Sequence, residues 1–154
     1  MMYAKHFGFN ELTNSIDHPE LVPKNRVDAV EHKEMGAKLS NLLESIRHIL
    51  GDEPMTVSSG FRNDELNTAV KSKVPTSSHT RFEAADVQHS ELSTITAFNV
   101  IKRAYGEGLL PNLRKVIIEG VEGKNWLHIE VATFVGDFKG FLATNDGTNY
   151  KRIA

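Results

Sequence analysis

The sequence predicts one α+β domain, residues 1–154, with a central, mostly antiparallel sheet and two main helices. Three observations predict this class. The chain has 154 residues, about the length of a single domain. Stretches with apolar residues at three- and four-residue intervals are mixed with short runs rich in β-branched residues. Hydrophobic residues make up 40% of the chain and charged residues 25%, so a disordered or fibrous protein is excluded.

The first half of the chain is expected to hold the longest helix. Asn10 is suited to cap a short helix near the N-terminus, because its side chain can accept a hydrogen bond from a free backbone N–H. Apolar residues follow one helical face over 27–50, and Gly51 is a typical helix stop, so an amphipathic helix packed on the core is expected. A short strand at 55–58 and a short helix at 63–70, opened by an asparagine cap, should follow.

The second half is expected to supply most of the sheet. Residues 71–78 are polar and should form a loop. The expected elements after it are a strand at 84–87, a helix at 93–104, paired strands at 113–119 and 126–133, and a last hairpin within 138–153. The segment Asn145-Asp146-Gly147 is typical of a turn at the middle of that hairpin.

The composition narrows the possible partners. The net charge of −2 provides no broad basic surface for a phosphate backbone, so no nucleic-acid partner is expected. The absence of cysteine excludes disulfides, thiolate metal sites and a thiol nucleophile. Any metal must therefore be bound by nitrogen and oxygen, and the seven histidines become the main candidates.

Targeting signals are also missing from the sequence. Residues 1–10 contain Lys5 and His6 and lack the apolar run of a secretory signal. No apolar stretch approaches the roughly 18 to 20 residues of a membrane span. We expect a protein made in the cytoplasm without a signal peptide and without membrane insertion.

Three ionisable residues are candidate metal ligands, and one of them is a carboxylate among apolar residues, where an unpaired charge would be costly. His79 ends a loop, and Asp86 follows within an apolar strand, beside Val87. His128 lies in another β-rich run. Two histidines, one carboxylate and a water are a known ligand set for catalytic zinc, and a metal would explain the carboxylate. The alternatives are a hydrogen-bonded core histidine at His128 and a turn-capping role for Asp86.

Several segments together resemble one enzyme family. Residues 77–87 resemble the Ser-x-His-x-x-Gly-x-Ala-x-Asp signature of the zinc D-alanyl-D-alanine carboxypeptidases, a family that includes phage L-alanyl-D-glutamate endopeptidases. Residues 58–67 resemble its Ser-Gly-Tyr-Arg…Leu-Asn segment, and 126–129 resemble its Trp-Val-His motif. The similarity covers about 7–131 and includes 10–15. The motifs occur in family order, which makes the resemblance specific and implies the family's hedgehog-like α+β fold.

The resemblance implies a role for each matching residue. It implies Zn²⁺ held by His79, Asp86 and His128. Arg62 matches the family arginine that binds substrate and stabilises the oxyanion, and Ser77 matches the serine that opens the signature, taken here as substrate-binding. A guanidinium suits an oxyanion or a terminal carboxylate, because its planar donors carry a fixed charge. The alternative for Arg62 is an ordinary surface salt bridge.

The sequence departs from the family pattern at two positions. Phe82 replaces the usual glycine, so either the backbone there needs no positive φ or its local path differs. Asn125 stands where several members carry a carboxylate three residues before the last histidine, and an amide cannot act as the base. Glu119, across the expected hairpin, is therefore the predicted general base. Glu130 is the reserve, because it shares a strand face with His128.

The remaining histidines have no comparable context and are expected to be surface or structural groups. These are His6, His18, His32, His48 and His89. Only His89, just past the Asp86 strand, is also a candidate to hydrogen-bond one of the metal ligands and so orient it.

The expected function is hydrolysis of an amide bond in peptidoglycan stem peptides by a zinc metallopeptidase. The resemblance points to a compact phage enzyme that reaches the cell wall after lysis-type release or as a virion component. One alternative is a non-catalytic virion or binding protein that keeps the fold and a structural zinc. Another is a small-molecule dipeptidase.

Overall fold

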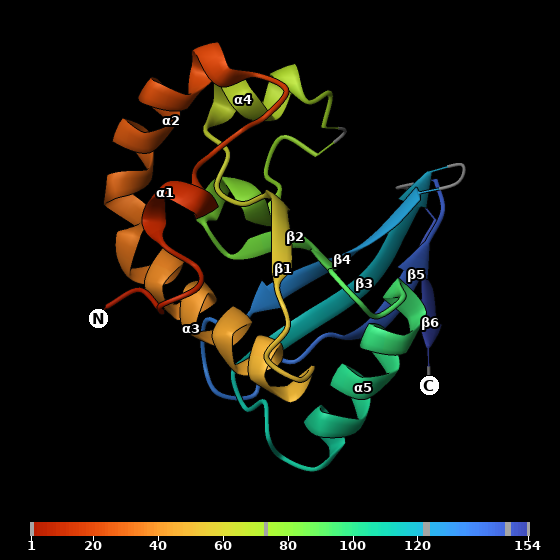
Figure 1. Ribbon diagram of the computed structural model, residues 1–154. Coiled ribbons are helices and arrows are strands. Elements are labelled where there is room, and N and C mark those ends of the chain that lie inside the picture. The colour runs from red at the N-terminus through yellow and green to blue at the C-terminus, as the bar shows by residue number, and fades with distance from the viewer. Residues whose placement is uncertain (1, 73, 122–123, 147–148, 154) are drawn as a thin grey trace.

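The computed structural model describes residues 2–72, 74–121, 124–146 and 149–153 (Figure 1). The α-helices are α1 (Phe9–Leu12), α2 (Val22–Ala29), α3 (Lys33–Ile49), α4 (Asp64–Ala69) and α5 (Thr94–Gly106), and the short 3₁₀ helices are η1 (Pro19–Leu21), η2 (Val30–His32) and η3 (Ser78–Arg81). The strands are β1 (Met55–Ser59), β2 (Ala84–His89), β3 (Leu113–Val121), β4 (Lys124–Val131), β5 (Gly140–Thr144) and β6 (Lys151–Ile153).

The strands form one six-stranded sheet in the order β1-β2-β4-β3-β5-β6. Neighbouring strands are antiparallel except for β3 and β5, which are parallel. The predicted α+β class with a mostly antiparallel sheet is therefore confirmed, and α3 and α5 are the two main helices.

The two faces of the sheet differ in character. Helices α3 and α5 pack against one face (Figure 1), where Val87 of β2 and Ile129 of β4 are fully buried in the core. Side chains alternate between faces along a strand. The residues next to these two, Asp86 and His128, therefore lie on the other face. They are also direct partners in the β2–β4 register.

The single helix predicted over 27–50 is wrong at its beginning. Helix α2 already starts at Val22, and the 3₁₀ turn η2 separates it from α3. This turn changes the phase of the helical face, so Val27 and Val30 are 71% and 51% exposed instead of packed on the core. The predicted stop at Gly51 agrees with the structure: its φ is 98°, and its N–H donates to His48 O as α3 ends.

The smaller elements follow the predictions with local differences. Asn10 lies inside α1 and does not cap it, because Gly8 occupies the N-cap position. The asparagine cap of α4 is present, since Asn63 Oδ1 accepts the Leu66 N–H at 2.8 Å. Strands β3 and β4 pair as predicted but extend further into the expected loop. The last hairpin pairs β5 with β6, and Gly147 at its expected turn lies outside the described residues.

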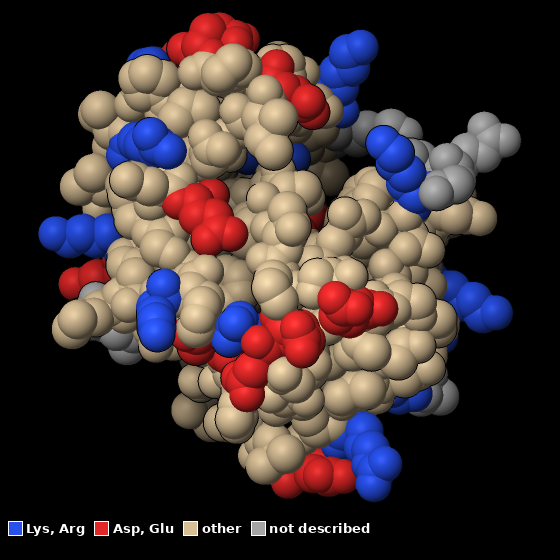
Figure 2. All heavy atoms as spheres, viewed as in Figure 1, with Lys and Arg blue, Asp and Glu red and all other residues tan. Residues whose placement is uncertain are grey.

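The surface carries mixed charge. The face seen in Figure 2 shows lysine and arginine side chains scattered among aspartate and glutamate. In the described part of the chain, no helix has the length and apolar character needed to cross a bilayer.

Candidate metal centre

The three candidate ligands predicted from the sequence lie together. His79, Asp86 and His128 are all buried, and each offers a ligand atom within 4.8 Å of the others. Asp86 Oδ2 is 3.4 Å from His79 Nε2, and Asp86 Oδ1 is 3.0 Å from His128 Nδ1. Tetrahedral zinc with bonds of about 2.0–2.2 Å separates its ligand atoms by roughly 3.3–3.6 Å. The nitrogen and oxygen donors therefore fit this metal in type, and the 3.4 Å pair matches its ligand spacing, while the 3.0 Å pair has the shorter distance of a hydrogen bond.

The orientation of His79 comes from the turn in which it lies. Ser77 caps η3, its Oγ accepting the His79 N–H at 3.3 Å. His79 Nδ1 lies 2.8 Å from Gly60 O, and because a carbonyl only accepts, Nδ1 carries the hydrogen. The lone pair of Nε2 is thereby directed toward Asp86. Burial lowers the pKa of His79, which keeps the ring neutral, as a ligand must be.

The charges of Asp86 and His128 are coupled. Burial alone would raise the pKa of Asp86, but the imidazoles of His79 and His128 hold it well below its usual range. Burial alone would lower the pKa of His128, but hydrogen bonds to Asp86 and Glu130 raise it to about 10. In the metal-free protein His128 is therefore an imidazolium that donates to two carboxylates. A metal at Nδ1 has to displace one of its protons.

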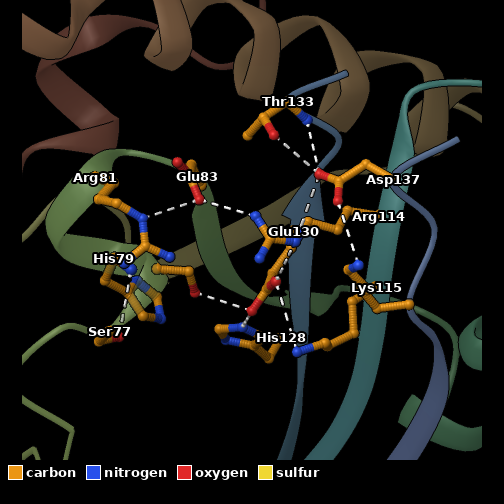
Figure 3. Close-up of polar contacts among 12 residues, drawn as sticks. Ser77, His79, Arg81, Glu83, Arg114, Lys115, His128, Glu130, Thr133 and Asp137 are labelled. Atoms are coloured by element: carbon orange, nitrogen blue, oxygen red, sulfur yellow. Dashed lines mark hydrogen bonds and ion pairs between the residues drawn. The ribbon is translucent and has the colours of Figure 1, made fainter. Parts of the chain in front are cut away.

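Glu130 lies on the far side of the His128 ring from Asp86. Its Oε2 is 2.7 Å from His128 Nε2 and also accepts the Ser78 hydroxyl at 2.9 Å (Figure 3). Burial would raise the pKa of Glu130, but the hydrogen bond from His128 lowers it to about 2. A carboxylate on the second nitrogen of a ligating histidine fixes the ring's orientation and tautomer.

Glu119 lies on the metal side of the same ring. Its Oε1 is 3.7 Å from His128 Nδ1, and it pairs across the hairpin with Trp126. Burial raises the pKa of Glu119, an effect that the charges of His128 and Arg62 only partly offset. The alternation of β4 places Asn125 on the opposite face from His128. In this strand register, Glu119 of β3 lies on the same face of the sheet as His128 and is not one of the three candidate ligands.

Arg62 and Ser77 border the cluster. The Arg62 backbone N–H donates to His79 O at 3.1 Å, and its Nη2 donates to Ser77 Oγ at 3.4 Å. Among the described residues, its guanidinium feels the charges of Asp86 and Glu119, and its buried Nε has no hydrogen-bond partner. The surface salt bridge considered for Arg62 is absent among the described residues.

A cleft of about 590 Å³ opens over the cluster. The three candidate ligands, Glu119, Glu130, Arg62 and Ser77 line it. Ile117, Leu142 and Tyr150 line it on the β3, β5 and C-terminal side. A larger and more open hollow of about 780 Å³ lies beside the end of the β3–β4 hairpin, and neither candidate histidine lines it. The cleft is therefore the part of the surface where a bound molecule would meet the three ligands.

The structure corrects one expectation about a supporting residue, Phe82, and agrees with a structural role for another, His89. Phe82 does adopt a positive φ, 61°, at the end of η3, so the left-handed conformation is kept without glycine. His89 Nδ1 accepts the backbone N–H groups of Glu91 and Leu92, so His89 organises the turn after β2.

The sequence also missed one group at the site. Arg114, on β3, lies among three carboxylates, one of which is Glu130. The only available signal was a pair of cations, Arg114 and Lys115, at the start of a β-rich run. Strand-end cations are usually solvated, so the pattern alone did not identify it.

The donor set, the free carboxylate and the buried guanidinium define a hydrolytic metal site of the peptidase type. The family model of peptidase M15 matches residues 5–129, so the chain belongs to the peptidase M15 family, the zinc D-alanyl-D-alanine carboxypeptidase type. This membership places it among the zinc-dependent peptidases. No curated protein matches the chain.

Proposed function

We propose that this protein is a zinc-dependent peptidase that hydrolyses an amide bond in the stem peptides of bacterial peptidoglycan. The observation that carries the proposal is the convergence of His79, Asp86 and His128 in a cleft beside Glu119 and Arg62. Peptide-stem specificity and a phage setting, with release by lysis or carriage in the virion, rest on the family resemblance. They are part of the proposal.

In this mechanism His79, Asp86 and His128 would hold the metal. Bound there, zinc would supply a Lewis acid that polarises the scissile carbonyl and acidifies water. The chemistry of the chain then depends on Glu119 and Arg62, the two groups that face the same space without ligating.

Glu119 is the proposed general base. It takes a proton from the attacking water as the water oxygen bonds to the carbonyl carbon, and it passes the proton to the leaving amine as the C–N bond breaks. Its pKa is raised by burial, toward the range in which a carboxylate can both accept and return a proton. Glu130 is unsuited to this role because its oxygens are engaged by His128, Ser78 and basic side chains.

Arg62 is the proposed anion binder. Its buried Nε has no hydrogen-bond partner in the described part of the chain, and the side chain borders the cleft that Asp86 also lines. A fixed positive charge there stabilises the oxyanion that develops on the carbonyl oxygen, or a substrate carboxylate.

The test compares Glu119→Gln with the unchanged protein. We expect zinc to bind stoichiometrically to both, while release of peptide fragments from purified sacculi, followed by mass spectrometry of muropeptides, falls at least about 100-fold in the variant. Asn125→Ala is the matched control on the neighbouring strand and should retain activity.

Three outcomes would contradict the proposal. Equal activity of Glu119→Gln and the parent would remove Glu119 from the mechanism. Stoichiometric zinc with wall peptides left intact would favour a non-catalytic virion or binding protein. Cleavage of free D-Ala-D-Ala without cleavage of sacculi would favour a small-molecule dipeptidase.

A further inference from the structure

We propose that Arg114 is a positioning residue for the metal centre: it holds Glu130 against His128 and so sets the metal affinity of that ligand. This inference rests on the proposed zinc site. Arg114 does not touch the cleft's ligands itself, and its effect would pass through one carboxylate.

A β-bulge brings Arg114 to this place. Leu113 pairs with Val131, and Lys115 pairs with Glu130, so Arg114 is an extra residue on β3. A bulge redirects a side chain that regular alternation would send to the other face. Here both cations form ion pairs with Glu130: Arg114 Nε lies 3.3 Å and Lys115 Nζ 3.8 Å from Glu130 Oε1, and among the described residues neither Arg114 Nε nor Glu130 Oε1 has a hydrogen-bond partner.

The Arg114 guanidinium lies between three buried carboxylates, as Figure 3 shows. Its Nη1 is 3.0 Å from Glu83 Oε1, and its Nε is 3.7 Å from Asp137 Oδ2. The side chains of Glu83, Glu130 and Asp137 are only 11%, 6% and 3% exposed. Buried carboxylates repel one another and are costly without a cation, so Arg114 balances the charge of all three and, together with Lys115, holds Glu130 in place.

The same contacts join the segments that carry the ligands. Glu83 directly precedes β2, on which Asp86 lies, and its backbone oxygen accepts the Val131 N–H at the end of β4 at 2.9 Å. Asp137 accepts the backbone N–H and hydroxyl of Thr133 at 3.0 and 3.1 Å, closing the turn after β4. Arg114 therefore ties the start of β2 and the end of β4, which are neighbours in the antiparallel pair, to Glu130.

Among the contacts of Arg114 with Glu83, Glu130 and Asp137, the one with Glu130 has a role beyond general stability. Glu130 Oε2 holds His128 Nε2, while Oε1 faces Arg114 and Lys115. If Arg114 is removed, Lys115 is the cation that remains at Oε1, and Glu130 can turn toward it and away from the His128 ring, which then loses the partner that directs Nδ1 to the metal. Loss of such a partner typically weakens metal binding about 10- to 100-fold.

The experiment measures zinc affinity by competition with a chromophoric chelator, together with the visible absorption of the Co²⁺-substituted protein. We expect Arg114→Gln to weaken zinc binding about 10- to 100-fold and to alter the cobalt spectrum. Arg114→Lys keeps the positive charge without the planar guanidinium. Its zinc affinity should lie between that of the parent and that of Arg114→Gln. If the Arg114→Gln variant does not fold, the zinc affinity of Arg114→Lys tests the inference in its place.

Two further variants separate positioning from a structural role. Asp137→Asn breaks another contact of the same guanidinium and should lower thermal stability while keeping zinc affinity. In a double-mutant cycle, Arg114→Gln should have little further effect on affinity in a Glu130→Gln background.

The inference is overturned if Arg114→Gln and Arg114→Lys bind zinc as tightly as the parent, if Asp137→Asn weakens binding equally, or if the effects of the Arg114 and Glu130 substitutions add. A parent protein that binds no zinc would overturn both this inference and the proposed function. An active, zinc-loaded parent with an unaffected Arg114→Gln would overturn this inference alone.

Discussion

Phe82 combines an unfavourable backbone conformation with a fully buried aromatic ring. Its φ of 61° and ψ of 30° lie in the left-handed region, which costs a non-glycine residue roughly 1–2 kcal/mol. The ring offsets this cost by packing on Phe9 and Phe61, with centroid distances of 6.3 and 5.4 Å. Gly36 of α3 makes room for it, since a Cβ there would lie 2.7 Å from the ring.

At this position we expect glycine to be tolerated better than alanine. Phe82→Ala loses the buried ring, about 3–5 kcal/mol, and keeps the backbone strain. Phe82→Gly loses the same ring but relieves the strain, so it should be more stable than the alanine variant by about 1 kcal/mol. Denaturant unfolding of both variants measures the difference. An alanine variant at least as stable as the glycine variant would show that the left-handed conformation carries no strain.

At the scale of elements, one buried side chain joins α2 to the segment that carries Arg62. Asn25 Nδ2 donates to Thr13 O and Phe61 O at 2.9 and 3.0 Å, and its Oδ1 accepts the Asn63 N–H at 2.7 Å. Asn25 thereby pairs backbone groups of the β1–α4 connection that no strand or helix pairs. The position of Arg62 over the cleft depends on this connection.

We expect Asn25→Ala to lower the free energy of unfolding by about 2–3 kcal/mol, because it leaves buried backbone groups unpaired. Asn41→Ala is the matched control: that asparagine on α3 is exposed and should change stability by less than about 1 kcal/mol. Urea unfolding of metal-free samples checks both. Equal effects of the two substitutions would contradict a special role for Asn25.

At the scale of the whole molecule, the metal site links stability to pH. The pKa of His128 in the metal-free protein is raised to about 10, above its usual value near 6.5. A raised histidine pKa means that the folded state binds the proton more tightly than the unfolded chain does. The resulting stabilisation is complete below about pH 6.5 and is lost as pH rises toward 10.

We therefore expect the metal-free protein to lose stability between pH 6.5 and about 10, and His128→Gln to lose less over the same window. In excess zinc the stability should instead increase with pH, because zinc binding requires a deprotonated His128 and is therefore tighter at higher pH. Thermal unfolding in chelator and in excess zinc measures both slopes. Parallel curves for parent and variant in chelator would show that His128 does not carry this effect.

Much of the architecture follows from local patterns. The strands β2 and β4, the Asn63 cap and the Gly51 stop depend on neighbours a few residues away, and the structure contains each of them. The start of the long helix was mispredicted because a 3₁₀ turn shifts the buried face without a distinctive sequence signal. Likewise, no local pattern distinguishes the capping role of Gly8 from that expected of Asn10.

By itself, the sequence determined the peptidase M15 family, the α+β class and the three residues that lie together as candidate ligands. These depend on residue types at fixed spacings along the chain. Only the tertiary structure decided which glutamate faces which nitrogen of His128 and how Arg114 reaches Glu130. The reason is that these contacts depend on strand register and on one bulge, and a shift of one residue in either would send the side chains to the other face of the sheet.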